Sequence, residues 1–436
     1  MYSANDHTIN LKMKFFLTAV FSLTLTATVS AYNSIPGIEY KDKIYDKNIK
    51  TVLLHREGWE LSNPVIKLGT SETLRLSFDD MNTDIKDYSY TFIHCSADWT
   101  PSDMMEHDYT KGFMENSITD YRFSFNTTID YVHYSFSFPN NDVQLTKSGN
   151  YILLVYKNFD RKNIVLTRRF MIVDPRFEIA AEVKQPLLFD YKLTSHEIDF
   201  TVTAPEPGID PYRDIKVVLM QNNRWDNAIT GLKPFLIQEN RFVYDYDEEN
   251  IFYAGKEYLY FDCKSVRFKS EQIQQILYQD SLYHIQLRKD EAKASRIYFY
   301  HEDINGKYVV RIQEGDDPAV DADYVNVYFS LPYDYPLTHG RVYVFGALTN
   351  WELNKTNEMV YNYDKKEYQL RLMLKQGYYN YTYALVENKS KSADVSYFMG
   401  SNYQTENDYM ILVYYRSIAS RYDELAGYKV VNSLKK

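Results

Sequence analysis

Short runs in which apolar and polar residues alternate with a period of two recur from about residue 50 to the end of the chain. Valine, isoleucine, threonine and aromatic residues dominate these runs, and turn-forming residues separate them. Because successive side chains of a strand point to opposite faces, this pattern predicts half-buried strands. The chain is therefore expected to be all-β, built from tandem immunoglobulin-like or early-set β-sandwich domains. Clear examples are residues 73–78, 88–94, 131–138, 151–156 and 164–173.

The composition agrees with a β protein. Tyrosine accounts for 43 of the 436 residues, whereas glycine accounts for only 15. Tyrosine suits a half-buried strand because its ring is apolar and its tip is polar. Helical periodicity is scarce, and its clearest instance is residues 270–280, where Ile273, Ile276 and Leu277 have helical spacing.

The N-terminus resembles a secretory signal. Two lysines flanking Met13 precede an uncharged apolar stretch, residues 15–29, which runs into the small residues of Val29-Ser30-Ala31. This order of charged, apolar and small residues is typical of a cleaved signal peptide, and the stretch is shorter than the roughly 20 apolar residues of a membrane span. We expect residues 1–31 to be the signal peptide, with cleavage before Tyr32 and with Met13 as the candidate true start. No later stretch predicts a membrane span.

Two turn-rich breaks divide the rest of the chain. Asp174-Pro175-Arg176 ends one series of strands, and the acidic segment 314–318 ends a second. We expect three β-sandwich units of similar size, covering residues 32–175, 176–316 and 317–436.

Charge and cysteine content restrict the partners. The formal net charge of −10 argues against nucleic acids and anionic lipids, because both bind basic surfaces. Two cysteines far apart in sequence, Cys95 and Cys263, provide no disulfide framework, and their roles are left open. Proteins, glycans or small molecules are the partners to expect.

Reactive side chains do not converge in the sequence. Residues 94–108 come nearest to a metal or nucleophile cluster, but His94 and Cys95 would point to opposite faces of a strand. The carboxylate pairs Asp79-Asp80 and Asp316-Asp317 stand at strand ends, where aspartate commonly caps loops. The sequence contains no Gly-rich phosphate loop, serine elbow or zinc-type histidine pair. We therefore expect no enzyme activity, no cofactor and no bound metal.

The last unit contains a more specific pattern. Residues 342–351, followed by the expected strands 368–374 and 377–383, resemble early-set immunoglobulin-like domains, among them glycogen-binding modules. In those modules the tryptophan that matches Trp351 stacks on a sugar face. Residues 387–396 offer no second tryptophan to complete such a platform. We expect Trp351 to be partly or wholly buried, so the motif indicates the fold more than sugar binding.

The first unit contains longer motifs, which are similar to the type IX secretion system plug protein family over roughly residues 40–175. They are Leu54-His55-Arg56-Glu57-Gly58-Trp59-Glu60-Leu61-Ser62, Leu76-Ser77-Phe78-Asp79-Asp80, Tyr88-Ser89-Tyr90-Thr91-Phe92-Ile93-His94-Cys95-Ser96-Ala97-Asp98-Trp99-Thr100-Pro101-Ser102, Tyr121-Arg122-Phe123-Ser124-Phe125-Asn126-Thr127-Thr128, Leu145-Thr146-Lys147-Ser148-Gly149-Asn150-Tyr151 and Leu166-Thr167-Arg168-Arg169-Phe170.

This resemblance implies a periplasmic protein of Bacteroidota-type bacteria, peripheral to the inner face of the outer membrane. It implies that the protein binds the translocon barrel of the type IX secretion system and closes its periplasmic opening without catalysis. The alternative is a periplasmic glycan-binding accessory protein, for which Trp351 would be the glycan-binding residue. The family motif residues, with a structural or an interface role left open, are Arg56, Glu57, Gly58, Trp59, His94, Asp98 and Trp99.

Overall fold

The structure is a computed structural model that describes residues 35–390 and 392–434. The expected signal peptide and its cleavage site before Tyr32 lie outside these residues. In the described part, strands follow one another with only single-turn helices between them, so the expected all-β class with tandem β-sandwiches is confirmed. None of the helices described is long and apolar enough to cross a membrane.

The first sandwich packs two sheets across an aromatic core. Leu76 and Tyr134 from one sheet meet Leu153 and Phe170 from the other. The strand order is β1-β12-β11-β5-β7 in one sheet, with β3 beside β12, and β2-β4-β9-β8 in the other, while β6 pairs with β10. The elements are β1 (Lys43–Ile44), β2 (Ile49–Arg56), β3 (Val65–Lys67), β4 (Leu74–Asp80), β5 (Tyr88–Cys95), α2 (Glu106–Tyr109), β6 (Thr110–Gly112), β7 (Asn116–Ser117), β8 (Tyr121–Phe123), β9 (Val132–Phe138), β10 (Val143–Leu145), β11 (Gly149–Lys157) and β12 (Ile164–Val173).

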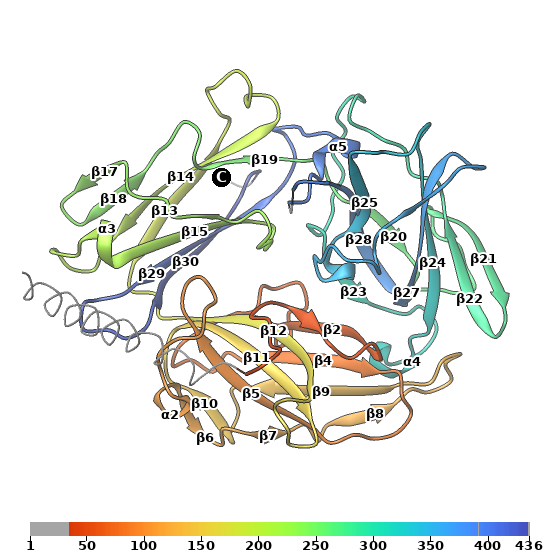
Figure 1. Cartoon of the computed structure of the whole chain (residues 1–436), viewed down its shortest axis with the longest axis horizontal. Coiled ribbons are helices and arrows are strands. Elements are labelled where there is room, and N and C mark those ends of the chain that lie inside the picture. Colours follow the sequence, from red (N-terminus) through yellow and green to blue (C-terminus); the bar gives the residue numbers. More distant parts are fainter. Residues whose placement is uncertain (1–34, 391, 435–436) are drawn as a thin grey trace, which may run out of the picture. The chain divides into compact units, whose positions relative to one another are not determined.

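The middle sandwich combines two separate stretches of the chain. Its sheets have the orders β13-β14-β18-β17, with β19 beside β14, and β16-β15-β29-β30. The last two strands of the chain, blue in Figure 1, therefore belong to the middle sandwich, where β29 pairs with β15 and β30 pairs with β29. The elements are β13 (Glu178–Lys184), β14 (Ser195–Thr203), α3 (Pro211–Asp214), β15 (Ile215–Gln221), β16 (Ile229–Thr230), β17 (Leu236–Gln238), β18 (Arg241–Tyr244), β19 (Ile251–Tyr253), β29 (Asp408–Tyr415) and β30 (Glu424–Asn432).

The third sandwich lies in the sequence between those two stretches. Its sheets have the orders β20-β28-β23, with β25 beside β28, and β21-β22-β24-β27-β26. The elements are β20 (Leu259–Asp262), β21 (Ile273–Gln279), β22 (Leu282–Leu287), β23 (Tyr308–Val310), α4 (Pro318–Asp321), β24 (Tyr324–Pro332), β25 (Gly340–Phe345), η1 (Ala347–Thr349), β26 (Val360–Asn362), β27 (Glu367–Lys375), β28 (Gly377–Glu387) and α5 (Ser396–Met399).

The strand pairing does not follow the boundaries expected for the second and third units, residues 176–316 and 317–436. The core of the middle sandwich includes Ile411 and Val413, which belong to the last stretch. The core of the third sandwich includes Phe261 and Ile285, which come before the expected break at residues 314–318. The acidic turn there is a surface loop inside the third sandwich, because strands on both sides of it enter one core. All three cores lie within one compact unit, residues 39–436.

The helical spacing at residues 270–280 does not correspond to a helix. This stretch contains β21, which pairs antiparallel with β22, and the register shifts between Ile273 and Gln275. Such a bulge adds one residue to a strand. Ile273 and Ile276 can therefore both face the core although they are three residues apart, a spacing that imitates a helix.

Candidate functional site

The last residue of β2 and the turn after it provide the first four motif residues. Arg56 donates a hydrogen bond from Nη2 to Oε1 of Glu72 at 2.8 Å, and its guanidinium lies 5.7 Å from the ring centroid of Trp59. Glu57 forms an ion pair with an arginine of β4. Gly58 has a φ of 76°, which glycine adopts without a steric penalty in a tight turn. Trp59 is 60% exposed, so the turn presents an oriented aromatic ring to solvent.

His94 lies inside the first sandwich. Its Nδ1 is 3.0 Å from Oγ of Ser102 and its Nε2 is 3.1 Å from the carbonyl oxygen of Ser148. Burial lowers the pKa of His94 to about 4, and burial raises the pKa of the neighbouring Cys95 thiol to about 12. His107, by contrast, is exposed on α2. In the described residues, none of these side chains belongs to a group with metal-binding spacing.

Asp98 and Trp99 occupy the loop after β5 and have different roles. Asp98 accepts hydrogen bonds from the backbone N–H of Thr100 at 3.1 Å and from its hydroxyl at 2.6 Å. Burial alone would raise the pKa of Asp98, but these hydrogen bonds lower it below its ordinary value. Trp99 has a φ of 67° and packs edge-on against Trp225 of the middle sandwich, with ring centroids 5.0 Å apart. Asp98 thus shapes a loop that holds Trp99 against a second sandwich.

Residues from all three sandwiches meet around a cavity of about 150 Å³, which we call the tryptophan–arginine cavity. The Arg169 guanidinium lies 4.7 Å from the ring centroid of Trp99 and 5.1 Å from that of Trp225. Two of the residues singled out in the sequence, Trp99 and Trp351, are brought together here. The tryptophans and cations that line the cavity are Trp99, Trp225, Trp351, Arg168, Arg169 and Lys307.

Trp351 is half-buried, as expected from the sequence. Its ring packs edge-on against Phe345, with centroids 5.2 Å apart, and against Tyr258, with centroids 6.1 Å apart. A Cβ atom on Gly306 would come within 2.4 Å of the Trp351 ring, so this close approach requires glycine. Trp351 is therefore part of the packing between loops.

Trp225 and Lys307 of the cavity were not singled out from the sequence, and Arg168 and Arg169 appeared there only within a quoted family motif, without a proposed role. One signal was available, because Arg168 and Arg169 are adjacent charges in β12, whose other residues are apolar or neutral. A strand with both faces covered rarely contains an unpaired charge. Nothing in the sequence indicates that Trp225 and Lys307 face the same space.

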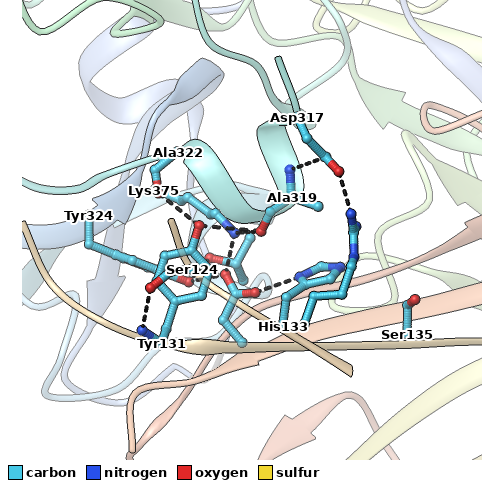
Figure 2. A network of polar contacts seen from close by, with 12 residues as sticks. Ser124, Tyr131, His133, Ser135, Asp317, Ala319, Ala322, Tyr324 and Lys375 are labelled. Carbon is cyan, nitrogen blue, oxygen red and sulfur yellow. Dashed lines mark hydrogen bonds and ion pairs between the residues drawn. The ribbon is translucent and has the colours of Figure 1, made fainter. Parts of the chain in front are cut away.

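A second polar site joins β4 and β9 of the first sandwich to α4, β24 and β27 of the third (Figure 2). Nζ of Lys375 lies 2.7 Å from Oδ2 of Asp79 and donates to the carbonyl oxygen of Ala319, also at 2.7 Å. Nδ1 of His133 contacts Oδ1 of Asp79 at 2.6 Å, and the Tyr324 hydroxyl donates to Oδ2 at 2.6 Å. Lys375 and Asp79 are both buried.

The charges in this network compensate one another. Burial alone would raise the pKa of Asp79, but the Lys375 ammonium and the hydrogen bond from His133 hold it below its ordinary value. The Lys375 ammonium also lies 4.1 Å from the ring centroid of Tyr131. Because the ion pair is sealed from solvent, the network is suited to joining two sandwiches.

In the part of the chain that the structure describes, one acidic group has the spacing of metal ligands. Glu197, Asp199 and Asp245 place carboxylate oxygens within 4.8 Å of one another. Burial and the nearby Asp199 raise the pKa of Glu197 to about 7. Lys184 already forms an ion pair with Asp199 at 2.5 Å, so we assign no metal to this group.

Comparison with known proteins connects the first sandwich to a family. Residues 49–174 match the family model described as "Type 9 secretion system plug protein 1st domain". No curated protein matches the chain.

Solved structures extend the similarity beyond the first sandwich. A crystal structure of a hypothetical protein from Parabacteroides merdae is 34% identical to this chain, with a TM-score of 0.88, and the alignment covers 91% of this chain and 100% of that one. A putative membrane anchored protein from Corynebacterium diphtheriae is 9% identical over 87% of this chain and 95% of that one, but its TM-score of 0.12 supports no argument.

The family match covers the sandwich in which most of the quoted motifs lie, from the Arg56–Trp59 turn to the arginines of β12. The resemblance expected from those motifs is therefore confirmed. The first sandwich of this chain, over residues 49–174, belongs to the type IX secretion system plug protein family.

Proposed function

We propose that this protein binds the periplasmic opening of the outer-membrane translocon barrel of the type IX secretion system and closes it without catalysis. The observation that carries the proposal is the family match over residues 49–174. The family indicates a role in type IX secretion, and closure of the barrel is the more specific step that we add. The location that follows is the periplasm, at the inner face of the outer membrane.

A reversible cap must keep its shape when it binds, and the contacts between the sandwiches favour this. The buried Lys375–Asp79 pair joins the first sandwich to the third. The Tyr414 hydroxyl donates to Oδ1 of Asn150 at 2.8 Å and thereby joins the middle sandwich to the first. Preformed contacts of this kind reduce the entropy lost on binding. A prearranged set of sandwiches is therefore suited to covering an opening.

Trp59 is the residue that we propose as an interface anchor. A stable interface buries at least about 1,000 Å² in total, and tryptophan is enriched among the residues that dominate its energy. Trp59 is exposed while the Arg56 side chain lies over its ring, so its orientation is fixed before binding. The ring could therefore be buried at a small entropic cost.

Two alternatives receive less support from the geometry. Glycan binding requires an open face of Trp351, but this ring packs against Phe345 and Tyr258. Hydrolysis at His94 requires a free ring nitrogen, but both nitrogens have hydrogen-bond partners in the core. We therefore propose a binding protein and no enzyme.

The test is outer-membrane permeability to a large antibiotic such as vancomycin. Deleting the protein should increase vancomycin uptake and leave secretion largely intact, because an unoccupied barrel stays open. A strain that also lacks the barrel should not leak. If the single deletion leaks no more than the wild type, or if the leak persists without the barrel, the proposal is wrong.

Trp59 provides a point mutation for the same assay. Trp59→Ala should restore less of the barrier than the wild-type protein and should reduce co-purification with the barrel in mild detergent by about tenfold or more. Tyr335→Ala is the matched control, because Tyr335 is an exposed aromatic side chain of the third sandwich. Equal behaviour of both variants would exclude Trp59 as the anchor.

A further inference from the structure

The tryptophan–arginine cavity contains an excess of positive charge. Arg168, Arg169 and Lys307 line it, and within residues 35–390 and 392–434 none of them has a carboxylate at ion-pair distance. Two carboxylates also line the cavity, but Glu60 forms an ion pair with Arg311 at 2.7 Å. The other carboxylate is Asp42, whose Oδ1 accepts a hydrogen bond from the backbone N–H of Arg169. One carboxylate therefore faces three cations.

Neutral oxygens hold the three cations in place. Arg168 donates to Oδ1 of Asn350 at 2.8 Å, and Lys307 donates to the carbonyl oxygen of Leu61 at 2.6 Å. Arg169 donates from Nε and Nη2 to the carbonyl oxygen of Tyr40. These contacts orient the cationic groups but do not neutralise their charge. Guanidinium and ammonium groups carry further N–H donors for another acceptor.

Burying these cations is unfavourable without an anion. Arg168 is only 5% exposed, and burial lowers its pKa below the ordinary value. Burial likewise lowers the pKa of Arg169 and that of Lys307. A buried cation that lacks a counter-charge destabilises the folded state. Asp42 and Glu352 attract Arg168 only from beyond ion-pair distance.

The indole of Trp99 supplies an independent sign of a missing partner. Trp99 lines the cavity and is 5% exposed, yet its Nε1–H has no hydrogen-bond acceptor. Buried N–H donors nearly always have an acceptor, because leaving one unsatisfied costs free energy. The wall of one cavity thus contains an N–H donor without an acceptor and cations without a counter-charge. An anionic oxygen would satisfy both.

We propose that the tryptophan–arginine cavity binds one small oxyanionic group, a carboxylate or a phosphate. Arg168, Arg169 and Lys307 supply the counter-charge, and the Nε1–H of Trp99 donates to one oxygen. The volume of about 150 Å³ accommodates one such group with little else. Because residues from all three sandwiches surround the site, bound anion also stabilises the junction between them.

The test titrates the purified mature chain with inorganic phosphate and with acetate, with chloride at the same ionic strength as the reference. Tryptophan fluorescence is the first readout, because Trp99 and Trp225 both contact Arg169. Thermal unfolding is the second readout, because a ligand of the folded state raises the melting temperature. We expect a saturable response in both. Tighter binding of phosphate than of acetate identifies a phosphate site, and the reverse identifies a carboxylate site.

Variants separate this site from unspecific salt effects. Arg169→Gln should weaken binding by about tenfold or more, the effect of removing one charge-assisted hydrogen bond. Lys307→Met should weaken binding by a similar factor. It provides a second test of the site in case Arg169→Gln does not fold. Arg161→Gln is the matched control, because Arg161 is a partly buried arginine ion-paired with Glu106 away from the cavity. No saturable response to either anion, or equal affinity in wild type, Arg169→Gln and Lys307→Met, would overturn the proposal.

Discussion

His94 illustrates how a single buried side chain can make the first sandwich sensitive to pH. Both of its ring nitrogens are engaged, and its position also restricts Gly149, because a Cβ atom there would come within 2.5 Å of Nε2. The folded pKa of about 4 lies below the ordinary histidine value of 6.5. The unfolded chain therefore takes up a proton at a pH where the folded chain does not.

The stability of the protein should fall as the pH falls from about 6.5 to about 4. Keeping His94 neutral in the core contributes about 3 kcal/mol to the free energy of unfolding. This contribution is complete above the pKa of His94 in the unfolded chain and is lost as the pH falls through its pKa in the folded chain. His94→Gln should flatten this part of the profile. Urea unfolding at a series of pH values measures it. An unchanged slope in the variant would contradict the assignment.

At the scale of elements, the alternating sequence pattern predicts regular strands correctly but fails for a strand that contains a bulge. The alternation in residues 73–78 predicts β4 because this strand pairs with β9 in an unbroken register. The run 164–173 predicts β12 as well, since the irregular pairing of β12 with β11 is confined to its first residues. In β21 the bulge next to Ile273 shifts the alternation, so the local spacing favours a helix. The partner strand β22 decides the conformation there, and a local window of sequence does not contain that information.

The same limit applies to the candidate site. Trp99 stood out as a family motif residue and Trp351 as the tryptophan of the early-set pattern, and Arg168 and Arg169 belonged to a quoted family motif. Their meeting depends on packing between three sandwiches, which no spacing in the sequence encodes. The Asp79–Lys375 pair is a similar case, because its members lie on β4 and β27.

The joint between β4 and β27 can be tested by removing one charge at a time. Lys375→Met leaves the Asp79 carboxylate buried without its main counter-charge and should destabilise the protein by about 3–5 kcal/mol. The double variant Asp79→Asn/Lys375→Met should recover much of this loss, and denaturant titration gives both values. Lys184→Met removes a more exposed ion pair and should cost less than about 1 kcal/mol. Additive effects of the two substitutions at the joint would contradict the coupling.

At the scale of the whole molecule, the three cores do not follow one another along the chain, because the stretch that forms the third core lies between the two stretches that form the middle core. We propose that the middle domain comprises residues 176–254 together with 405–432, and that residues 255–404 form the third domain. The sequence suggested breaks at turn-rich segments because turns are local. The return of β29 to β15 is a long-range pairing without a local signal.

Removing residues 406–436 should therefore unfold the middle sandwich while the third sandwich stays folded. Hydrogen exchange should show lost protection in β15 and retained protection in β24 and β27. A milder variant, Ile411→Ala, should cost about 2–5 kcal/mol, because Ile411 is fully buried in the middle core. Leu434→Ala is the control on an exposed residue. Protection of β15 in the truncated chain would contradict the domain division.

The insertion of one sandwich within another also determines the order of events when the chain is made. Synthesis begins at the N-terminus, and domains fold as units when their residues become available. The third sandwich can close before residues 408–432 exist, whereas β15 must wait with one edge unpaired until β29 arrives. An unpaired apolar edge recruits strands of other chains. The newly made protein is thus most prone to aggregation during this interval, and a chaperone that covers β15 would act before the last strands arrive.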